Sequence, residues 1–206
     1  INIVLMALVV ADLLGVIPKR FRGVGIALAA AIKVTPAAFG LIFLLRRDWP
    51  SAFRAMGAFA ATVAFGYWLR PDSTVYFWTT EFFATDRAGD PSFFRNQALT
   101  GLIARFDFSD GTAKALWLAG ALVVVAGTAW AAYRFLRADE PVVAVALVGL
   151  ASLLAAPIAV THHWVYALFL VPLLVAPAYR RWWPVLLPAT VVFLIGPNHL
   201  LREASS

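Results

Sequence analysis

The amino-acid sequence predicts an all-α fold, a polytopic transmembrane helix bundle, and three observations support this. The 206 residues are 62% hydrophobic and 14% charged, with a mean hydropathy of +0.82; in a soluble domain about half of the residues are apolar and about a quarter are charged. Apolar residues form runs close to the roughly 20 residues that a membrane-crossing helix needs. Basic residues gather between these runs, where topology signals occur. We therefore expect a multi-pass protein of the cell (plasma) membrane, with the lipid bilayer as a partner.

Seven apolar segments predict about six to seven membrane segments, with an interfacial helix in a long outer loop. The second to fifth segments are long enough to span a bilayer as helices. The sixth and seventh contain Pro172 and Pro188, so we expect kinked or tilted helices there. The segments comprise residues 1–16, 24–45, 52–69, 113–135, 141–158, 164–178 and 183–197.

The domain organisation that follows is a single transmembrane domain over residues 1–206, with residues 70–112 inserted between spans as the outer loop. Because the chain begins at Ile1 inside an apolar segment, we interpret it as a C-terminal fragment of a longer protein. The net charge of +6 lies in short clusters and does not indicate nucleic acid as a partner. The chain has no cysteine, which excludes disulfides and thiolate metal sites.

Three basic clusters predict the orientation of the bundle. "RRDWPSAFR" (residues 46–54), "YRFLRADE" (133–140) and "YRRWW" (179–183) follow alternate ends of the apolar segments. The positive-inside rule places these clusters in the cytoplasm. The outer loop and the turn around His162 then face outward.

A fourth basic cluster, "PKRFRG" (residues 18–23), does not fit simple alternation, which places it outside. Two alternatives remain open for the segment that follows, residues 24–45. It crosses the membrane once, or it breaks near Pro36 and returns to the cytoplasmic side, so that both flanking basic clusters lie inside. Non-helical backbone is tolerated at membrane depth where protein buries it.

Lys33 is the charged residue in the middle of this segment, in "AAIKVTP". A lysine at bilayer depth costs about 2.5–3.5 kcal/mol on insertion scales, so it usually faces a partner or a polar cavity. One interpretation is an anion contact, such as a lipid phosphate. The other is a structural lysine that binds free carbonyls at the Pro36 break or extends towards the interface.

The outer loop begins "LRPDSTVYFWTTEFFA" (residues 69–84), which predicts a short helix over residues 72–84. Pro71 precedes it, and Asp72 or Ser73 is the expected cap. Such an amphipathic helix at the end of a span is typical of an interfacial helix that lies along the membrane surface. Its aromatic face comprises Tyr76, Phe77, Trp78, Phe82 and Phe83.

The loop continues "TDRAGDPSFFRNQALTGLIARF" (residues 85–106), with mixed polar chemistry that favours a substrate-binding loop. The alternative is a solvated loop with surface ion pairs. Loops much longer than about 15 residues are more often functional or disordered than simple connections, and the aromatic content argues against disorder. The polar residues are Asp86, Arg87, Asp90, Arg95, Asn96, Gln97 and Arg105.

Two adjacent histidines, His162 and His163, follow Pro157 at the outer end of the fifth segment, in "AVTHHWVYALF". Neighbouring residues on a helix point about 100° apart, so both imidazoles can face one point only if the backbone turns there. A neutral histidine donates, accepts or shuttles a proton, and a protonated one holds an anion. We expect no metal, because no third ligand lies at a recognisable spacing. The alternative is a His–Trp anchor at the membrane interface, with Trp164.

Four motifs, taken in order, resemble glycosyltransferase family 87. They are "INIVLMALVVADLLG" (1–15), "AAIKVTPAAFGLIFLLRRDW" (30–49), "FFATDRAGDPSFFRNQALTGLIARF" (82–106) and "APIAVTHHWVYAL" (156–168). The resemblance implies a many-spanning enzyme of the GT-C fold. Such an enzyme moves a mannosyl residue from a polyprenyl-phosphate donor to a cell-envelope glycolipid or glycan on the outer face. It needs no cofactor, nucleotide sugar or metal.

In this family the catalytic base is an aspartate of the first outer loop, which precedes the part that this chain covers. Asp12 lies inside a span and does not match it, so we expect the isolated fragment to be inactive. The departing phosphate needs cations or hydrogen-bond donors, and the resemblance makes His162 and His163 the catalytic candidates. The substrate-binding candidates are Lys33, Trp78, Asp86, Arg87, Asp90, Arg95, Asn96 and Gln97.

Two other classes of function compete with the transferase. A multi-span transporter or channel subunit with a histidine-based relay predicts ionisable residues in several spans. Lys33 and Asp12 are the residues within spans here, while the other polar residues gather in one outer loop, which favours an enzyme. A non-catalytic membrane scaffold would leave the polar loop unexplained.

Overall fold

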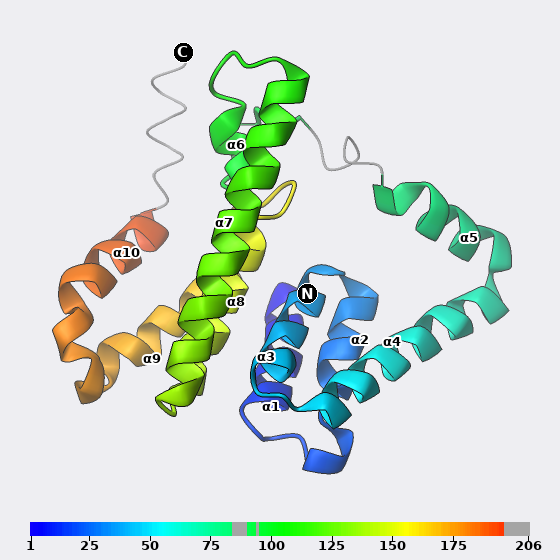
Figure 1. The fold of residues 1–206 in the computed structure, drawn as a ribbon, viewed down its shortest axis with the longest axis horizontal. Helices are drawn as coiled ribbons and strands as arrows, with labels where there is room; N and C mark the ends of the chain where they lie inside the picture. The colour runs from blue at the N-terminus through cyan, green and yellow to red at the C-terminus, as the bar shows by residue number, and fades with distance from the viewer. Residues whose placement is uncertain (84–89, 94, 196–206) are drawn as a thin grey trace.

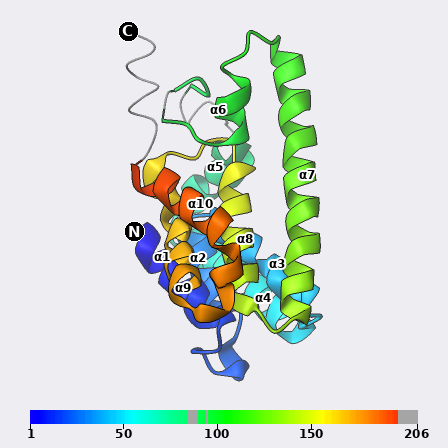
Figure 2. The ribbon, with the colours of Figure 1, turned by 90° about the vertical axis from the view of Figure 1, so that its left-hand side faces the viewer.

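The computed structural model describes residues 1–83, 90–93 and 95–195, and every regular element in these ranges is a helix. The all-α class is therefore confirmed. Figure 1 shows a helical unit at the N-terminus, an arm formed by α4 and α5, and a long helix α7 beside α8. Figure 2 shows α7 along one edge, with α9 and α10 on the side that faces the viewer.

The N-terminal unit packs four helices and a short 3₁₀ turn around one apolar core. The elements are α1 (Asn2–Leu13), α2 (Val24–Ile32), η2 (Thr35–Phe39), α3 (Gly40–Leu45) and α4 (Trp49–Leu69), with η1 (Lys19–Phe21) in the first connection. Aromatic and branched side chains from these elements are almost completely buried, and this burial supplies most of the driving force for packing. They include Leu5, Val9, Leu13, Phe39, Ile42 and Phe43.

The rest of the chain adds the arm, the long helix and a bent C-terminal layer. The arm ends in α5 (Pro71–Thr79) and η3 (Glu81–Phe83). The long helix α7 (Asp110–Arg137) follows the short α6 (Leu99–Ile103) and pairs with α8 (Pro141–Leu154). The C-terminal layer comprises η5 (Thr161–Phe169), α9 (Leu170–Val175), η6 (Pro177–Trp182) and α10 (Trp183–Ile195).

Residues 24–45 fold back on themselves. Helix α2 has nine residues and ends at Ile32, because Lys33 is extended (φ −150°, ψ 124°) and Pro36 starts the next turn. The returning helix α3 ends at Leu45. The Arg22 guanidinium then lies 3.8 Å from the Asp48 carboxylate, so both ends of the segment are at one end of the unit. Of the two alternatives left open by the sequence, the structure favours the returning one.

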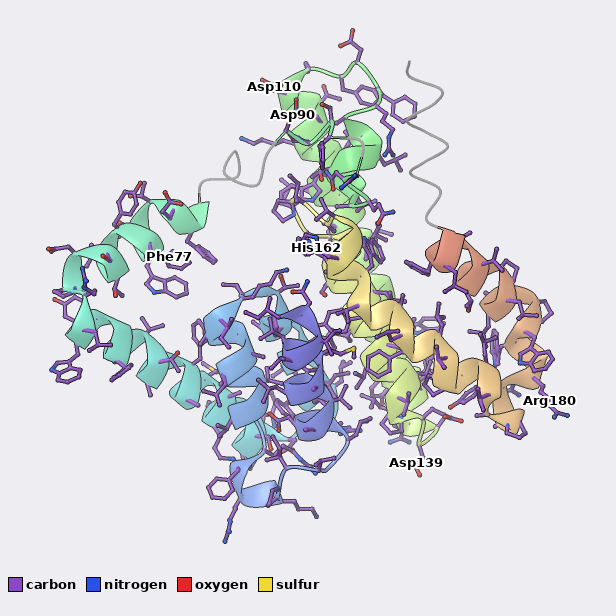
Figure 3. All side chains as sticks on the ribbon, turned by 180° about the vertical axis from the view of Figure 1, so that it is seen from behind. Phe77, Asp90, Asp110, Asp139, His162 and Arg180 are labelled. Carbon is purple, nitrogen blue, oxygen red and sulfur yellow. The ribbon has the colours of Figure 1, made fainter. Side chains whose placement is uncertain are left out.

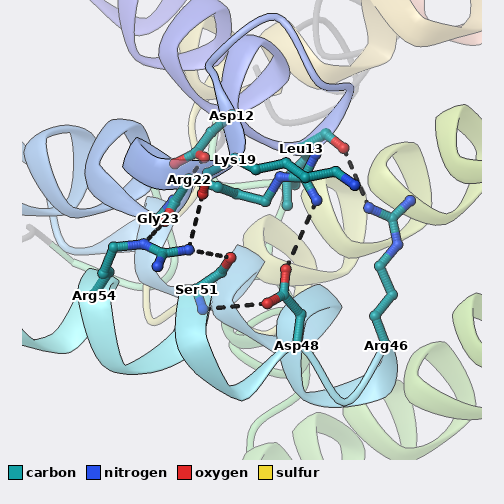
Figure 4. A network of polar contacts seen from close by, with 9 residues as sticks. All are labelled: Asp12, Leu13, Lys19, Arg22, Gly23, Arg46, Asp48, Ser51 and Arg54. Atoms are coloured by element: carbon teal, nitrogen blue, oxygen red, sulfur yellow. Dashed lines mark hydrogen bonds and ion pairs between the residues drawn. The ribbon is translucent and has the colours of Figure 1, made fainter.

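A network of polar contacts joins the two basic clusters at this end (Figure 4). The Arg54 guanidinium donates hydrogen bonds to the Arg22 carbonyl at 2.9 Å, the Lys19 carbonyl at 3.0 Å and Ser51 Oγ at 3.1 Å. The Asp48 carboxylate accepts from the Ser51 N–H at 3.2 Å and caps α4. Charge-assisted bonds of this kind fix the loop before α2 against the start of α4.

Asp12 caps α2 from the neighbouring helix. Its carboxylate is completely buried and accepts hydrogen bonds from the Gly23 N–H at 2.7 Å and the Ile26 N–H at 2.9 Å. Gly23 has a φ of +102°, and a Cβ there would lie 2.4 Å from the Ser51 carbonyl oxygen, so glycine is required. Both oxygens of Asp12 accept hydrogen bonds from backbone N–H groups at the start of a helix, so the residue has a structural role. A proton relay within the spans would have relied on Asp12 and Lys33, and it loses the first of these.

The structure does not confirm the expected six to seven membrane segments. Among the described helices, α7, with 28 residues, is long and apolar enough to cross a membrane. Residues His162–Val175 and Pro177–Leu194 would add a second span only as one broken unit, since they are bent by 109°. Helices α1 and α8 have 12 and 14 residues and rise only about 18–21 Å, against a hydrocarbon core of about 30 Å.

The expected helix over residues 72–84 is present but differs at both ends. It begins at Pro71, with Arg70 at the N-cap position, so the expected cap at Asp72 or Ser73 was wrong. Proline at the first helical position needs no N–H partner, which explains the earlier start. The helix ends at Thr79, and η3 follows. The aromatic side chains of this region cluster around Trp78. The centroid of its ring lies 5.8 Å from that of Phe59 on α4, 5.1 Å from that of Phe77 and 5.3 Å from that of Phe82.

Candidate functional site

The histidine pair begins η5, directly after an irregular stretch that follows α8. In Figure 3, His162 lies between the end that carries Asp90 and Asp110 and the end that carries Asp139 and Arg180. The two imidazole centroids are 4.4 Å apart, with the ring planes at 75°. The rings contact each other edge to face, and they border two different cavities.

The His163 ring is fixed by its own backbone turn. The Val160 N–H donates to His163 Nδ1 at 3.3 Å, and the His163 N–H donates to the Val160 carbonyl at 2.8 Å. A ring nitrogen that accepts a hydrogen bond carries no proton, so a neutral His163 carries its proton on Nε2. In this geometry His163 is a hydrogen-bond donor and not a cation.

A small cavity with a few polar groups in its lining lies between His163 and Lys33. Its volume is about 10 Å³, and Asn2, Thr35 and Tyr166 also line it. That volume holds about one water molecule. The structure therefore brings the predicted residues Lys33 and His163 together, but the space between them accommodates a water and is too small for a phosphate group.

A larger groove opens on the other side of the pair, where His162 is exposed. Its volume is about 610 Å³, and it runs between the start of α1, η5, α9 and α10. Ligand pockets are commonly about 300–1,000 Å³, with an apolar lining and a few polar groups. Here the polar side chains include those of Asn2, Gln97, His162 and Thr190. The apolar lining includes Leu168, Val171, Val192 and Phe193.

Asn96, predicted to bind substrate, instead forms internal hydrogen bonds. It is completely buried. Its Nδ2 donates to the Pro91 carbonyl at 3.0 Å and to Thr100 Oγ1 at 3.1 Å, and its Oδ1 accepts from the N–H groups of Ala98 at 3.1 Å and Ala159 at 3.2 Å. Two donors and two acceptors are the full capacity of a side-chain amide. The amide has nothing left for a sugar hydroxyl in this arrangement.

The other loop candidates are dispersed. Asp90 is exposed, and the Ser92 backbone N–H, which donates to it at 2.8 Å, holds the pKa of this carboxyl below its usual value. Arg95 is also exposed, whereas Gln97 borders the groove. Asp86 and Arg87 lie outside the described residues.

Trp78 belongs to the arm and not to the histidine site. It packs in the aromatic cluster between α4 and α5, and Figure 3 shows its neighbour Phe77 far to the side of His162. The structure thus assembles Lys33, Gln97, His162 and His163 around two cavities. Within the described part of the chain, no group of three or more histidine and acidic residues could hold a metal ion.

Asn2 is a site residue that the sequence analysis missed. Its Nδ2 donates to the His162 carbonyl at 2.7 Å, and its side chain lines both cavities. Tyr166 was missed as well; its ring packs against Phe39 at 5.1 Å and leaves no space for a side chain at Gly149. The available signal for Asn2 was a single amide in an otherwise apolar run, but its partner is 160 residues away.

A comparison of the sequence with known protein families finds one that matches most of the chain. The model of glycosyltransferase family 87 matches residues 1–157, a stretch that includes Lys33 and the polar loop and ends shortly before the histidine pair. No solved structure matches the chain.

Three curated relatives carry related names. The chain is 40% identical over 184 residues to the polyprenol-phosphate-mannose-dependent alpha-(1-2)-phosphatidylinositol mannoside mannosyltransferase of Mycobacterium tuberculosis, covering 88% of this chain and 42% of that protein. It is 36% identical over 217 residues to the protein of that name from Mycolicibacterium smegmatis, covering 98% and 49%. A phosphatidylinositol pentamannoside mannosyltransferase of the latter organism is 34% identical over 174 residues, covering 82% and 41%. The chain spans less than half the length of these relatives, and by the family match and these identities it belongs to glycosyltransferase family 87.

Proposed function

We propose that the protein is a membrane mannosyltransferase that moves a mannosyl residue from a polyprenyl-phosphate donor to a phosphatidylinositol mannoside on the outer face. The family and the names of the relatives support this donor and this acceptor. The structural observation that carries the proposal is the mainly apolar groove of about 610 Å³ that His162 helps to line.

The groove suits a lipid-linked sugar because its two parts match the two parts of such a donor. A prenyl chain is wholly apolar and would replace water along Leu168, Val171 and Phe193, which gains about 25 cal/mol per Å² of apolar surface buried. The phosphate would then lie beside the exposed His162, which lines the same groove. Hydrogen-bond donors and cations at that position stabilise the charge that develops as the phosphate departs.

Filling the groove tests this proposal. We expect Val171→Trp to lower kcat/KM for polyprenyl-phosphate-mannose by about tenfold or more, because a bulky ring would occupy the space of the lipid chain. Val171 lines the groove and is 53% exposed. The measurement is transfer of radiolabelled mannose to phosphatidylinositol mannoside by membranes that contain the variant, compared with membranes that contain the natural protein.

Val175→Trp is the matched control, since Val175 lies on the same helix, is 77% exposed and does not line the groove. We expect it to keep normal transfer. If both variants transfer mannose at the rate of the natural protein, the groove is not the donor site. If the natural protein itself transfers no mannose from this donor, the proposed function is wrong.

Aromatic residues beside arginines support the proposed orientation. The Arg134 guanidinium lies 5.7 Å from the Trp130 ring centroid, and Arg181 lies 5.7 Å from that of Trp182. Trp–Arg pairs of this kind are typical of a membrane–water interface. Together with the ion pair between Arg22 and Asp48, they define one basic end, which we assign to the cytoplasm.

Cysteine labelling tests this orientation, because the chain has no cysteine of its own. Single cysteines replace Arg20, Trp49, Asp90 and Arg181, which are all exposed. With an impermeant reagent in intact cells, we expect labelling at position 90 and protection at positions 20, 49 and 181, until the membrane is opened. Labelling of 20 and 49 from opposite sides would contradict the folded-back segment, and labelling of 90 and 181 from the same side would contradict the orientation.

A further inference from the structure

The irregular stretch before the histidine pair is held by the polar loop. Besides the Asn96 bond to the Ala159 N–H, the Gln97 N–H donates to the Ala159 carbonyl at 2.8 Å, and Thr100 Oγ1 donates to the Pro157 carbonyl at 2.6 Å. Three hydrogen bonds thus connect positions about 60 residues apart in the chain, where no regular element supplies backbone partners. We call this set of contacts the Asn96 clasp.

The centre of the clasp is closely packed. The Asn96 side chain is completely buried with all four hydrogen-bonding positions used. Gly101 lies against it: a Cβ there would be 2.3 Å from the Asn96 carbonyl oxygen and 2.8 Å from its Cγ. A buried amide in this state has one arrangement, because any rotation would leave donors or acceptors without partners.

The Asn96 clasp is connected to the imidazole of His163 through two backbone residues. Asn96 and Gln97 fix Ala159 on both its N–H and its carbonyl. The next residue, Val160, supplies the N–H that His163 Nδ1 accepts and the carbonyl that receives the His163 N–H. A shift of Ala159 therefore changes the position of the one backbone donor that sets the tautomer of the ring.

We propose that Asn96 is a positioning residue that acts through Ala159 and Val160, so that His163 keeps Nδ1 as an acceptor and presents Nε2–H. The ring position that results lies beside Lys33 and against His162. The catalytic importance of this position rests on the proposed function, whereas the effect on the ring does not. A misplacement of about 1 Å at a reacting group costs up to about 10²-fold in rate.

The experiment compares Thr100→Val with Thr62→Val in the natural protein. Both substitutions keep the shape of the side chain and remove a hydroxyl that donates to a backbone carbonyl, at 2.6 Å in each case. Thr100 belongs to the clasp, and Thr62 lies on α4. Asn96→Ala is the stronger variant, and the mild Thr100→Val keeps the test decisive if Asn96→Ala does not fold.

The first readout is the ¹⁵N imidazole spectrum of the histidine-labelled protein in detergent, with signals assigned by single histidine variants. We expect His163 of the natural protein and of Thr62→Val to show an unprotonated Nδ1 and a protonated Nε2 at neutral pH. Thr100→Val should shift His163 towards the other tautomer. An unchanged His163 spectrum in Thr100→Val and in folded Asn96→Ala overturns the positioning role, whatever the activity.

The second readout is a double-mutant cycle on mannosyl transfer. We expect Thr100→Val to lower kcat about tenfold with little change in KM, and to have no further effect when His163 is alanine. Equal effects in both backgrounds contradict action through His163. If His163→Ala alone transfers normally, His163 has no role in catalysis and the catalytic importance of the Asn96 clasp is refuted, while the spectrum still decides whether Asn96 positions the ring.

Discussion

Removal of the imidazoles is expected to give the largest loss of activity: His162→Ala and His163→Ala should both slow mannosyl transfer, at least one of them by about 10²- to 10³-fold. His162 is exposed and lines the groove in which a donor phosphate would lie. His163 contacts it at 4.4 Å between ring centroids. A group that acts on transition-state charge has an effect of this size, whereas an interfacial anchor affects mainly folding.

The measurement is the initial rate of transfer in membranes, normalised to the amount of protein present. His162→Gln distinguishes a hydrogen-bond donor from a cation, because the amide donates but carries no charge. The hydrogen bond from Asn2 Nδ2 to the His162 backbone carbonyl stays in all these variants, so the turn itself keeps that support. Near-normal rates in both alanine variants would make the pair structural, and Lys33 with the loop arginines would become the phosphate candidates.

The largest effect on stability is expected at Asp12. Asp12→Ala should lower the free energy of unfolding by about 2–4 kcal/mol, because it leaves the N–H groups of Gly23 and Ile26 buried without an acceptor and removes the cap of α2. Asp12→Asn should lower the free energy of unfolding by a smaller amount, since the amide oxygen still accepts a hydrogen bond whereas the amide nitrogen does not. Thermal unfolding in detergent measures the difference.

Asp72→Ala is the matched control, since Asp72 is an exposed acidic residue in the first turn of another helix, α5. Substitutions at such sites usually change stability by less than about 0.5 kcal/mol. An Asp12→Ala protein that is as stable as the natural one but inactive would point to a proton-transfer role instead. That outcome would favour the relay hypothesis over the structural cap.

Local properties of the sequence predicted much of the helical layout. The rest depends on contacts between residues that are far apart in the chain. The run over residues 113–135 predicted α7 closely, and Pro71 predicted the start of α5 to within one residue but not its end, because length, hydropathy and proline geometry are local properties. Whether residues 24–45 cross or return depends on Asp48 and Arg22 meeting, which the order of residues does not state. The sequence therefore left two alternatives at Pro36.

The candidate site was likewise predicted only in part from the sequence. The loop was expected to carry substrate-binding polar groups, and its residue types alone do not tell which of them point inward. Asn96 is saturated by partners that include the Ala159 N–H, 63 residues away, so only the fold could assign it an internal role. Lys33 and His163 were both selected for their charge or chemistry, and their common cavity of about 10 Å³ required the structure.

The fold at Lys33 also constrains how the chain enters a bilayer during synthesis. A membrane span needs roughly 20 residues, whereas α2 has nine residues and is about 14 Å long, so it is too short to cross a bilayer core alone. In the proposed membrane location, α2 and α3 would therefore enter as a hairpin, which Asp12 of α1 caps and which packs against Ser51 of α4. The cavity that Lys33 shares with His163 is completed only when η5, much later in the chain, packs against this hairpin.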